Sequence, residues 1–338
     1  MISYSNWSVL SVNFIIVLYL ALSGVTLCSV LYLVGAKWVV EVKHLATALF
    51  ALFPLALVLL VVLLVGYEHT FPWLGHTSHG ENVHMPGWYT VPLLAVREII
   101  GMLTVMYVWW VFIQRQKVRE NSPEDAERFH SIAVWIPFYT VLYATMVAWD
   151  FEMTLKPSWH SAIYGMQNLV SNFGMFLAFL LVWIYVLNTR DKLVRPVKTY
   201  IYNYLAQMLL AFTLLWMYTF FAQYLTIWYG NFADERDRID GMQNGDFSLL
   251  WWSMVALKFV IPFVSFGFPV TRHNPKVTVV IATGIIVGTL LERFVWIAGI
   301  NGTGTIPVLW GALVSMAVIV VGYQLVRRTM ARNQLIKG

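Results

Sequence analysis

Charge and cysteine are both scarce in this sequence. Only 12% of its 338 residues are charged, against about 25% in soluble domains, whereas 59% are hydrophobic and the mean hydropathy is +0.68. This composition excludes a soluble globular enzyme and a disordered chain. The single cysteine, Cys28, excludes an intrachain disulfide, a thiolate-held iron–sulfur cluster and a c-type haem attachment. Any redox cofactor must therefore belong to a partner subunit or be held by other ligands.

Long apolar runs fill most of the chain. A helix needs about 20 apolar residues to cross the hydrocarbon core of a bilayer, and no run shows the alternation of a membrane-barrel strand. Nine runs approach or exceed this length: 9–35, 46–67, 91–114, 131–149, 162–187, 201–228, 249–270, 277–299 and 306–326. We therefore predict an all-α polytopic membrane protein with nine transmembrane helices, in which residues 1–338 form a single membrane domain.

The basic residues predict how these helices are oriented. One set of alternating loops, together with the C-terminal tail, contains 16 of the 22 Lys and Arg residues, and the opposite set contains three. Lys and Arg accumulate on the cytoplasmic side of membrane proteins. The pattern predicts an N-terminus outside and a C-terminus in the cytoplasm. The net charge of +5 then reflects cytoplasmic loops, and no nucleic-acid partner is expected.

Ionisable residues within or beside the spans are candidate functional groups, because a charge in a bilayer is costly. We predict proton transfer for Asp150, Glu152, Glu98, Glu292, Glu68, His69 and Lys258. Arg97 and Arg293 would tune these groups, and no side chain is expected to be catalytic. The alternative is a purely structural role. Adjacent helical residues do not face each other, so each charge would then need a partner on a neighbouring helix, for example Arg97 with Glu292 or Arg293 with Asp150.

Histidine and tryptophan positions limit the cofactors. No histidine lies in the middle of a span, so a pair of axial ligands for an intramembrane haem is not expected. The longest outer loop contains His76, His79 and His84, which could bind zinc or copper, but their spacing matches no closed metal site. Docking of this loop onto a partner subunit is the favoured interpretation, and no metal is predicted. Trp216, in the middle of a span, is expected to pack, and residues 229–248 are expected to form an acidic outer loop.

Four segments, in order along the chain, resemble the NrfD/PsrC-like membrane subunits, most closely the ActF subunit of alternative complex III. Residues 149–161 (WDFEMTLKPSWHS) resemble the pattern D-W-x-M-S-L-x-P-H-W-x-S of that subunit, and residues 222–231 (AQYLTIWYGN) resemble S-Q-Y-x-x-I-W-Y-x-N. Residues 91–97 (VPLLAVR) are similar to V-P-x-x-x-x-R, and residues 258–263 (KFVIPF) to N-F-x-x-P-F. An acid of the eighth span is retained as Glu292.

The resemblance implies two four-helix bundles, here at 9–149 and 162–299, and an additional C-terminal span at 306–326. It implies a membrane subunit of a quinol:cytochrome c oxidoreductase complex, not catalytic alone, which contributes assembly and proton translocation or quinone binding. Quinone or menaquinone would be its diffusible cofactor, and no group would be bound covalently. The implied partners are lipids, a second NrfD-like subunit, a periplasmic iron–sulfur subunit, and multihaem and monohaem cytochrome c subunits that carry the c-haems.

The chain also departs from the family pattern. Lys156 stands where the family has an acid before the proline, and Ser158 stands where it has a histidine, with His160 two positions later. One N-terminal span is missing, which agrees with the expected outside N-terminus. This chain therefore matches the architecture of the family better than it matches a proton-transfer path inherited from the family. Two alternatives stay open from sequence: a PsrC-like quinone-binding anchor of a molybdenum or sulfur-compound reductase, and a secondary transporter.

Overall fold

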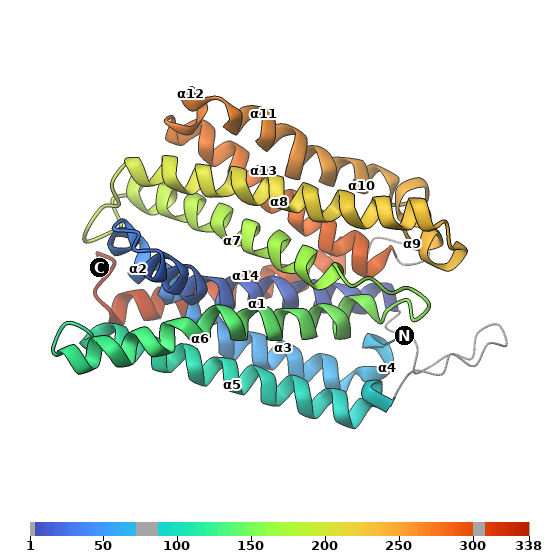
Figure 1. Ribbon diagram of the computed structural model, residues 1–338, viewed down its shortest axis with the longest axis horizontal. Coiled ribbons are helices and arrows are strands. Elements are labelled where there is room, and N and C mark those ends of the chain that lie inside the picture. Colours follow the sequence, from blue (N-terminus) through green and yellow to red (C-terminus); the bar gives the residue numbers. More distant parts are fainter. Residues whose placement is uncertain (1–3, 72–86, 300–307, 338) are drawn as a thin grey trace.

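The protein is an all-α polytopic membrane protein. The computed structural model describes residues 4–71, 87–299 and 308–337 (Figure 1). Within these ranges, nine helical segments are long and apolar enough to cross a membrane, as the sequence predicts. They comprise α1 (Tyr4–Leu33), α2 to α3 (Val39–Ala48, η1 Leu49–Leu52, Phe53–Val65), α5 (Val91–Val118), α6 (Pro123–Ala148), α7 (Tyr164–Thr189), α8 (Tyr200–Gly230), α10 to α11 (Ser248–Val255, Ile261–Gly267), α13 (Pro275–Ala298) and α14 (Val308–Arg332).

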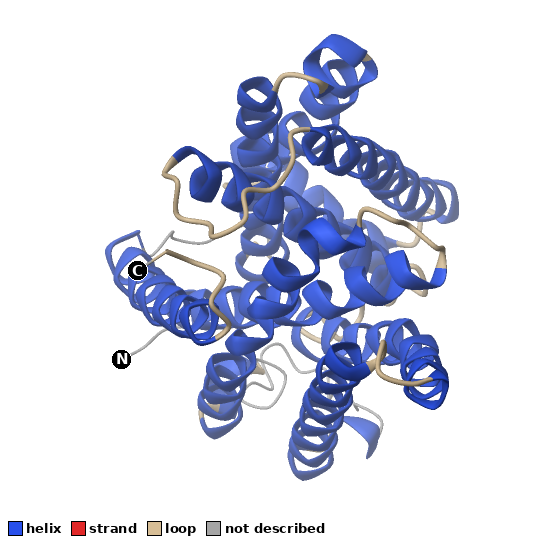
Figure 2. Cartoon of the chain, turned by 90° about the vertical axis from the view of Figure 1, so that its left-hand side faces the viewer, coloured by secondary structure: helices blue, strands red, loops and turns tan. Residues whose placement is uncertain are grey.

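Shorter helices lie at the ends of the bundle. They are α4 (Tyr67–Thr70), the 3₁₀ turn η3 (Gly87–Tyr89), α9 (Ala233–Asn244) and α12 (Pro269–Arg272). Figure 1 shows the N-terminus and α9 at one end and the C-terminus at the opposite end. We call these the α9 end and the C-terminal end. Figure 2, which views the molecule from the C-terminal end, shows the membrane helices end-on.

Helix α1 occupies the centre and packs against α3, α6, α7, α13 and α14. It is the most deeply buried of the nine spans, whereas α14 is the most exposed. At Gly24, α1 approaches α2 so closely that an added methyl group would overlap the carbonyl oxygen of Ala46. The pairs α5–α6 and α7–α8 lie to either side. The division into bundles at 9–149 and 162–299 stays a prediction.

Local sequence signals explain several helix ends. Ser122 caps α6 by accepting a hydrogen bond from the backbone N–H of Asp125 at 3.1 Å, with a proline at the first helical position. Asn274 caps α13 in the same way, bonding the N–H of Lys276 at 3.1 Å. Helix α8 ends at Asn231, which adopts a left-handed conformation with φ of 51°. Side-chain and backbone preferences therefore fix these boundaries independently of the lipid.

Candidate functional site

Two of the membrane spans contain a π-helical turn, and both turns carry ionisable residues. The turn Trp149–Met153 extends α6 and carries Asp150 and Glu152. The turn η5 (Ala256–Val260) joins α10 to α11 and carries Lys258. Such turns are rare and frequently occur at functional sites. Here they direct three charged side chains into the interior, where all three are buried.

A proline follows each of these turns. Pro157 follows Met153 by four residues, and Pro262 follows Lys258 by four. Proline has no N–H to bond the carbonyl four positions earlier, and its ring crowds that carbonyl. The regular α-helical hydrogen bonds cannot continue at these two carbonyls, so the backbone adopts another geometry nearby.

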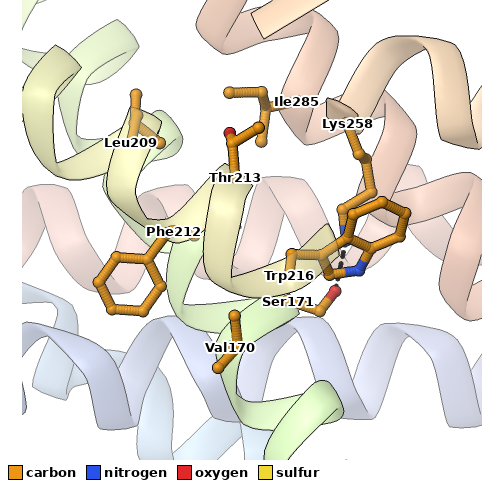
Figure 3. Close-up of a pocket in the computed structure, with 9 residues that line it drawn as sticks. Val170, Ser171, Leu209, Phe212, Thr213, Trp216, Lys258 and Ile285 are labelled. Atoms are coloured by element: carbon orange, nitrogen blue, oxygen red, sulfur yellow. Dashed lines mark hydrogen bonds between the residues drawn. The ribbon is translucent and has the colours of Figure 1, made fainter. Parts of the chain in front are cut away.

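Glu292, on α13, accepts hydrogen bonds from three neighbouring elements. The ammonium group of Lys258 and the hydroxyl of Ser171 both bond its Oε2 atom. The indole Nε1 of Trp216 donates to its Oε1 atom at 3.0 Å. Lys258 also donates to the Ser171 hydroxyl at 2.5 Å and lies 4.7 Å from the centre of the Trp216 ring (Figure 3). Ser171 therefore accepts from the lysine and donates to the carboxylate, which makes it a hydrogen-bonded bridge between them.

Arg293 joins Glu292 to a second carboxylate. Its NH1 atom lies 2.5 Å from Oε2 of Glu152, and its NH2 atom lies 3.0 Å from Oε1 of Glu292. The hydroxyl of Tyr164 donates to Glu152 as well. We call Glu152, Lys258, Glu292 and Arg293 the inner network. With two acids and two bases, all buried, the inner network has no net charge, which reduces the cost of holding ions away from water.

A second ion pair joins α5 to the π-helical turn of α6. Arg97 makes a bidentate contact with Asp150, with its Nε at 2.8 Å from Oδ2 and its NH2 at 2.5 Å from Oδ1. Its guanidinium also lies over Trp88 and Tyr89 of the 3₁₀ turn. Burial raises the pKa of the Tyr89 phenol, Asp150 raises it further, and Arg97 opposes this. Because Asp150 and Glu152 stand two positions apart on the same turn, this turn connects the pair to the inner network.

Glu98 lies next to this pair and is fully buried. It faces Asp150 and the hydroxyl-bearing end of Tyr143. In the described part of the chain, no basic side chain forms an ion pair with Glu98. Glu98 is therefore a second buried carboxyl beside the Arg97–Asp150 pair, and it is a candidate for proton exchange.

Arg238, on α9, is a buried charge that the sequence analysis placed in an outer loop. Residues 233–244 form a helix instead, and this helix packs Ile239 and Met242 against the bundle. The guanidinium of Arg238 donates to the carbonyls of Glu152, Met153 and Trp296 at 3.0–3.3 Å. The Met153 carbonyl also accepts the backbone N–H of Lys156 at 3.3 Å. Arg238 thus holds the π-helical turn in place from the α9 end.

A polar stripe along α7 leads toward the inner network. Gln167, Asn168, Ser171 and Asn172 share one face of this helix and are all buried. Side-chain atoms of Gln167, and of Gln223 on α8, have no hydrogen-bond partner within the described residues. Buried polar groups are nearly always satisfied, commonly by ordered water. A cavity of about 10 Å³ beside Lys258 (Figure 3) is close to the space that one water requires.

The structure brings most of the predicted site residues together. Glu98, Asp150, Glu152, Lys258 and Glu292 lie in or beside the two ion-paired groups, with Arg97 and Arg293. Glu68 and His69 do not join them. Both are exposed on α4 at the α9 end, where the His69 ring lies 5.5 Å from the Trp7 ring and is tilted by 50° relative to it.

The two example pairings do not form, and two adjacent residues expected not to meet do. Arg97 pairs with Asp150 and not with Glu292, and Arg293 pairs with Glu152 and not with Asp150. Glu292 and Arg293, although adjacent, approach within 3.0 Å, because long side chains can turn toward each other beyond the helix surface. Trp216 does more than pack, since it donates to Glu292. The polar stripe on α7, with its spacing of three and four residues, is the signal that could have located Ser171.

In the ranges that the structure describes, no group of three His, Cys, Asp or Glu side chains is placed to hold a metal ion. The predicted loop residues His76, His79 and His84 lie outside the described residues. Their role stays a prediction.

Comparisons with known proteins leave the family open. No protein-family model matches this chain. A search of curated proteins finds no significant relative. The site is therefore interpreted from its own chemistry and from the sequence resemblance.

Proposed function

We propose that this protein is a membrane subunit of a bacterial respiratory complex that oxidises quinol and reduces an acceptor such as cytochrome c. In this proposal, the subunit contributes assembly and conducts protons, and its neighbours carry the c-haems and iron–sulfur clusters. The observation that supports a proton-handling role is the inner network, where two acids, two bases and hydroxyl groups meet inside a membrane domain. The resemblance to ActF-like subunits supports the partners.

The contacts suggest an order for proton transfer. Protons would enter at the α9 end, where α5 begins. Glu98 and Asp150 lie toward this end and would receive the protons first. Glu152, on the same turn as Asp150, would receive them next, and Tyr164 provides a hydroxyl beside it. Glu292 and Lys258, joined directly and through Ser171, form the innermost step. Carboxyl, hydroxyl and amine groups within hydrogen-bond distance are the groups that relay protons.

The charge pattern supports an orientation. The C-terminal end carries the basic loops, so it would face the cytoplasm, and the α9 end would face the outside of the inner membrane. The outer face is also where haem and iron–sulfur partners are expected by resemblance. A second NrfD-like subunit would then lie beside this one in the membrane. Quinone or menaquinone would exchange with that assembly from the lipid.

Isolation of the chain from its native membrane in mild detergent tests this proposal. We expect a c-type α-band in the reduced-minus-oxidised spectrum, together with haem, iron–sulfur and second NrfD-like subunits in mass spectrometry. A molybdopterin partner without c-haems would support the anchor of a molybdenum or sulfur-compound reductase instead. A colourless preparation without redox partners would overturn both, and solute uptake by proteoliposomes would then support a transporter.

A further inference from the structure

A cleft of about 460 Å³ opens at the C-terminal end of the bundle, far from the inner network. It lies where α1 ends, α2 begins and α5 ends. Its walls comprise Leu31, Tyr32, Gly35, Ala36, Lys37, Val39, Val40 and Arg119. Because α1, α2 and α5 belong to membrane spans that terminate here, the cleft stands at the level of the lipid headgroups.

Two basic side chains border this cleft. Lys37 is exposed in the loop between α1 and α2. The guanidinium of Arg119 is held over the rings of Tyr32 and Phe129, at 5.7 and 5.6 Å from their centres. Glu120 contacts Arg119 at 3.3 Å, but the Glu120 side chain is 79% exposed, and such surface pairs are weak. The cleft therefore presents a positive rim that a single solvated carboxylate only partly offsets.

The remaining walls are apolar. Leu31 and Val39 are buried at its base, whereas Val40 is half-exposed, and Val34 beside it is largely exposed. Val34 follows the end of α1 and Val40 lies at the start of α2, so both are exposed apolar side chains beside the membrane spans. The cleft thus combines a cationic rim with an exposed apolar side.

We propose that this cleft binds an anionic phospholipid, with the headgroup phosphate between Lys37 and Arg119 and an acyl chain along Val34 and Val40. Charge complementarity selects the headgroup, because basic pockets at the membrane surface recognise anionic lipids. Arg119 suits a phosphate because a guanidinium can form two parallel hydrogen bonds to its oxygens. The site is separate from the inner network and does not depend on the redox role of the protein.

Native mass spectrometry of the full-length chain, as purified with any subunits it retains, tests this site. The protein is titrated with dioleoyl-phosphatidylglycerol and, separately, with dioleoyl-phosphatidylcholine. We expect one tightly bound phosphatidylglycerol per chain and no comparable phosphatidylcholine. The variant Lys37→Gln/Arg119→Gln should bind phosphatidylglycerol more weakly by roughly tenfold to thirtyfold, since each basic residue near the surface contributes to anionic-lipid affinity.

Two matched variants separate this site from general attraction to a basic surface. Lys117→Gln/Arg328→Gln removes the same charge from exposed residues at the same end, and it should leave binding within about twofold. Lys37→Arg/Arg119→Lys keeps both charges and should retain the lipid. If the first double variant does not fold, Lys37→Gln at its exposed position still predicts a loss of about fivefold.

Three results would overturn the proposal. They are equal binding of phosphatidylcholine, an equal loss in the Lys117→Gln/Arg328→Gln control, and displacement of the lipid by millimolar glycerol 3-phosphate. The last result would identify a site for a soluble phosphate instead of a lipid.

Discussion

Replacing Glu292 with glutamine should strongly destabilise the folded protein. Glu292 neutralises Lys258 and shares Arg293 with Glu152, and all four side chains are buried. In the Glu292→Gln variant, two cations face a single carboxylate. Breaking a buried ion pair by removing one partner costs about 3–5 kcal/mol, because the remaining charge stays uncompensated. We expect a loss of this size in the free energy of unfolding.

A second substitution should restore much of that stability. Lys258→Met removes the cation that Glu292 neutralises, and methionine fills a similar space. The double variant Glu292→Gln/Lys258→Met then retains only the Arg293–Glu152 pair, which has no net charge. Replacement of both partners of a buried pair is often close to neutral. We therefore expect the double variant to be more stable than Glu292→Gln by at least about 2 kcal/mol.

Equilibrium unfolding in mixed detergent and SDS micelles measures these differences. The matched control is Glu124→Gln, which removes a carboxylate from the exposed Arg128–Glu124 pair, where the carboxylate side chain is 82% exposed. Its free energy of unfolding should change by less than about 1 kcal/mol. Additive losses in the double variant would refute the reasoning, because they would show that Lys258 and Glu292 do not neutralise each other.

Two further predictions concern other parts of the molecule. Gly24→Val should destabilise the protein by about 1–3 kcal/mol, measured by the same unfolding assay, because its side chain would overlap the Ala46 carbonyl; unchanged stability would contradict the close approach of α1 and α2. Glu41 accepts a bond from Lys198 at 2.8 Å and raises the pKa of that amine above its ordinary value of 10.5. This contribution to stability is present below that value and is lost as pH rises through the folded-state pKa. Glu41→Gln should lower the pKa of Lys198 toward 10.5, as measured by NMR of ¹³C-methylated lysines, whereas an unchanged pKa would contradict the pair.

The nine spans could be predicted from sequence because lipid imposes a strong length requirement on apolar helices. The described helices confirm the count. The burial of charged residues could also be anticipated, since a charge in a membrane span is expected to face the protein interior. Composition and periodicity were sufficient for both.

The partners within the site could not be predicted in the same way. Periodicity shows which face a residue occupies, but it does not show which helix lies opposite. The pairing of Arg97 with Asp150 depends on the π-helical turn at Trp149–Met153. Pro157 and Pro262 were visible in the sequence, yet a proline predicts an interruption and not its geometry.

Arg238 was missed for a different reason. The segment around it is strongly acidic, which is typical of a solvated loop. The apolar residues Ile239 and Met242 share a helical spacing with one face of α9, and this face packs Arg238 against the bundle. A short amphipathic helix at a membrane surface gives only a weak signal in sequence, because few apolar residues define it.

Proton translocation by the native assembly in proteoliposomes tests the central claim most directly. The variant is Glu98→Gln, which removes a buried carboxyl and leaves the Arg97–Asp150 pair intact. Glu68→Gln, at an exposed position of the α9 end, is the matched control. The account predicts that Glu98→Gln lowers the number of protons moved per electron while quinol oxidation stays within about twofold, and that the control changes neither. An unchanged proton stoichiometry in Glu98→Gln would contradict it.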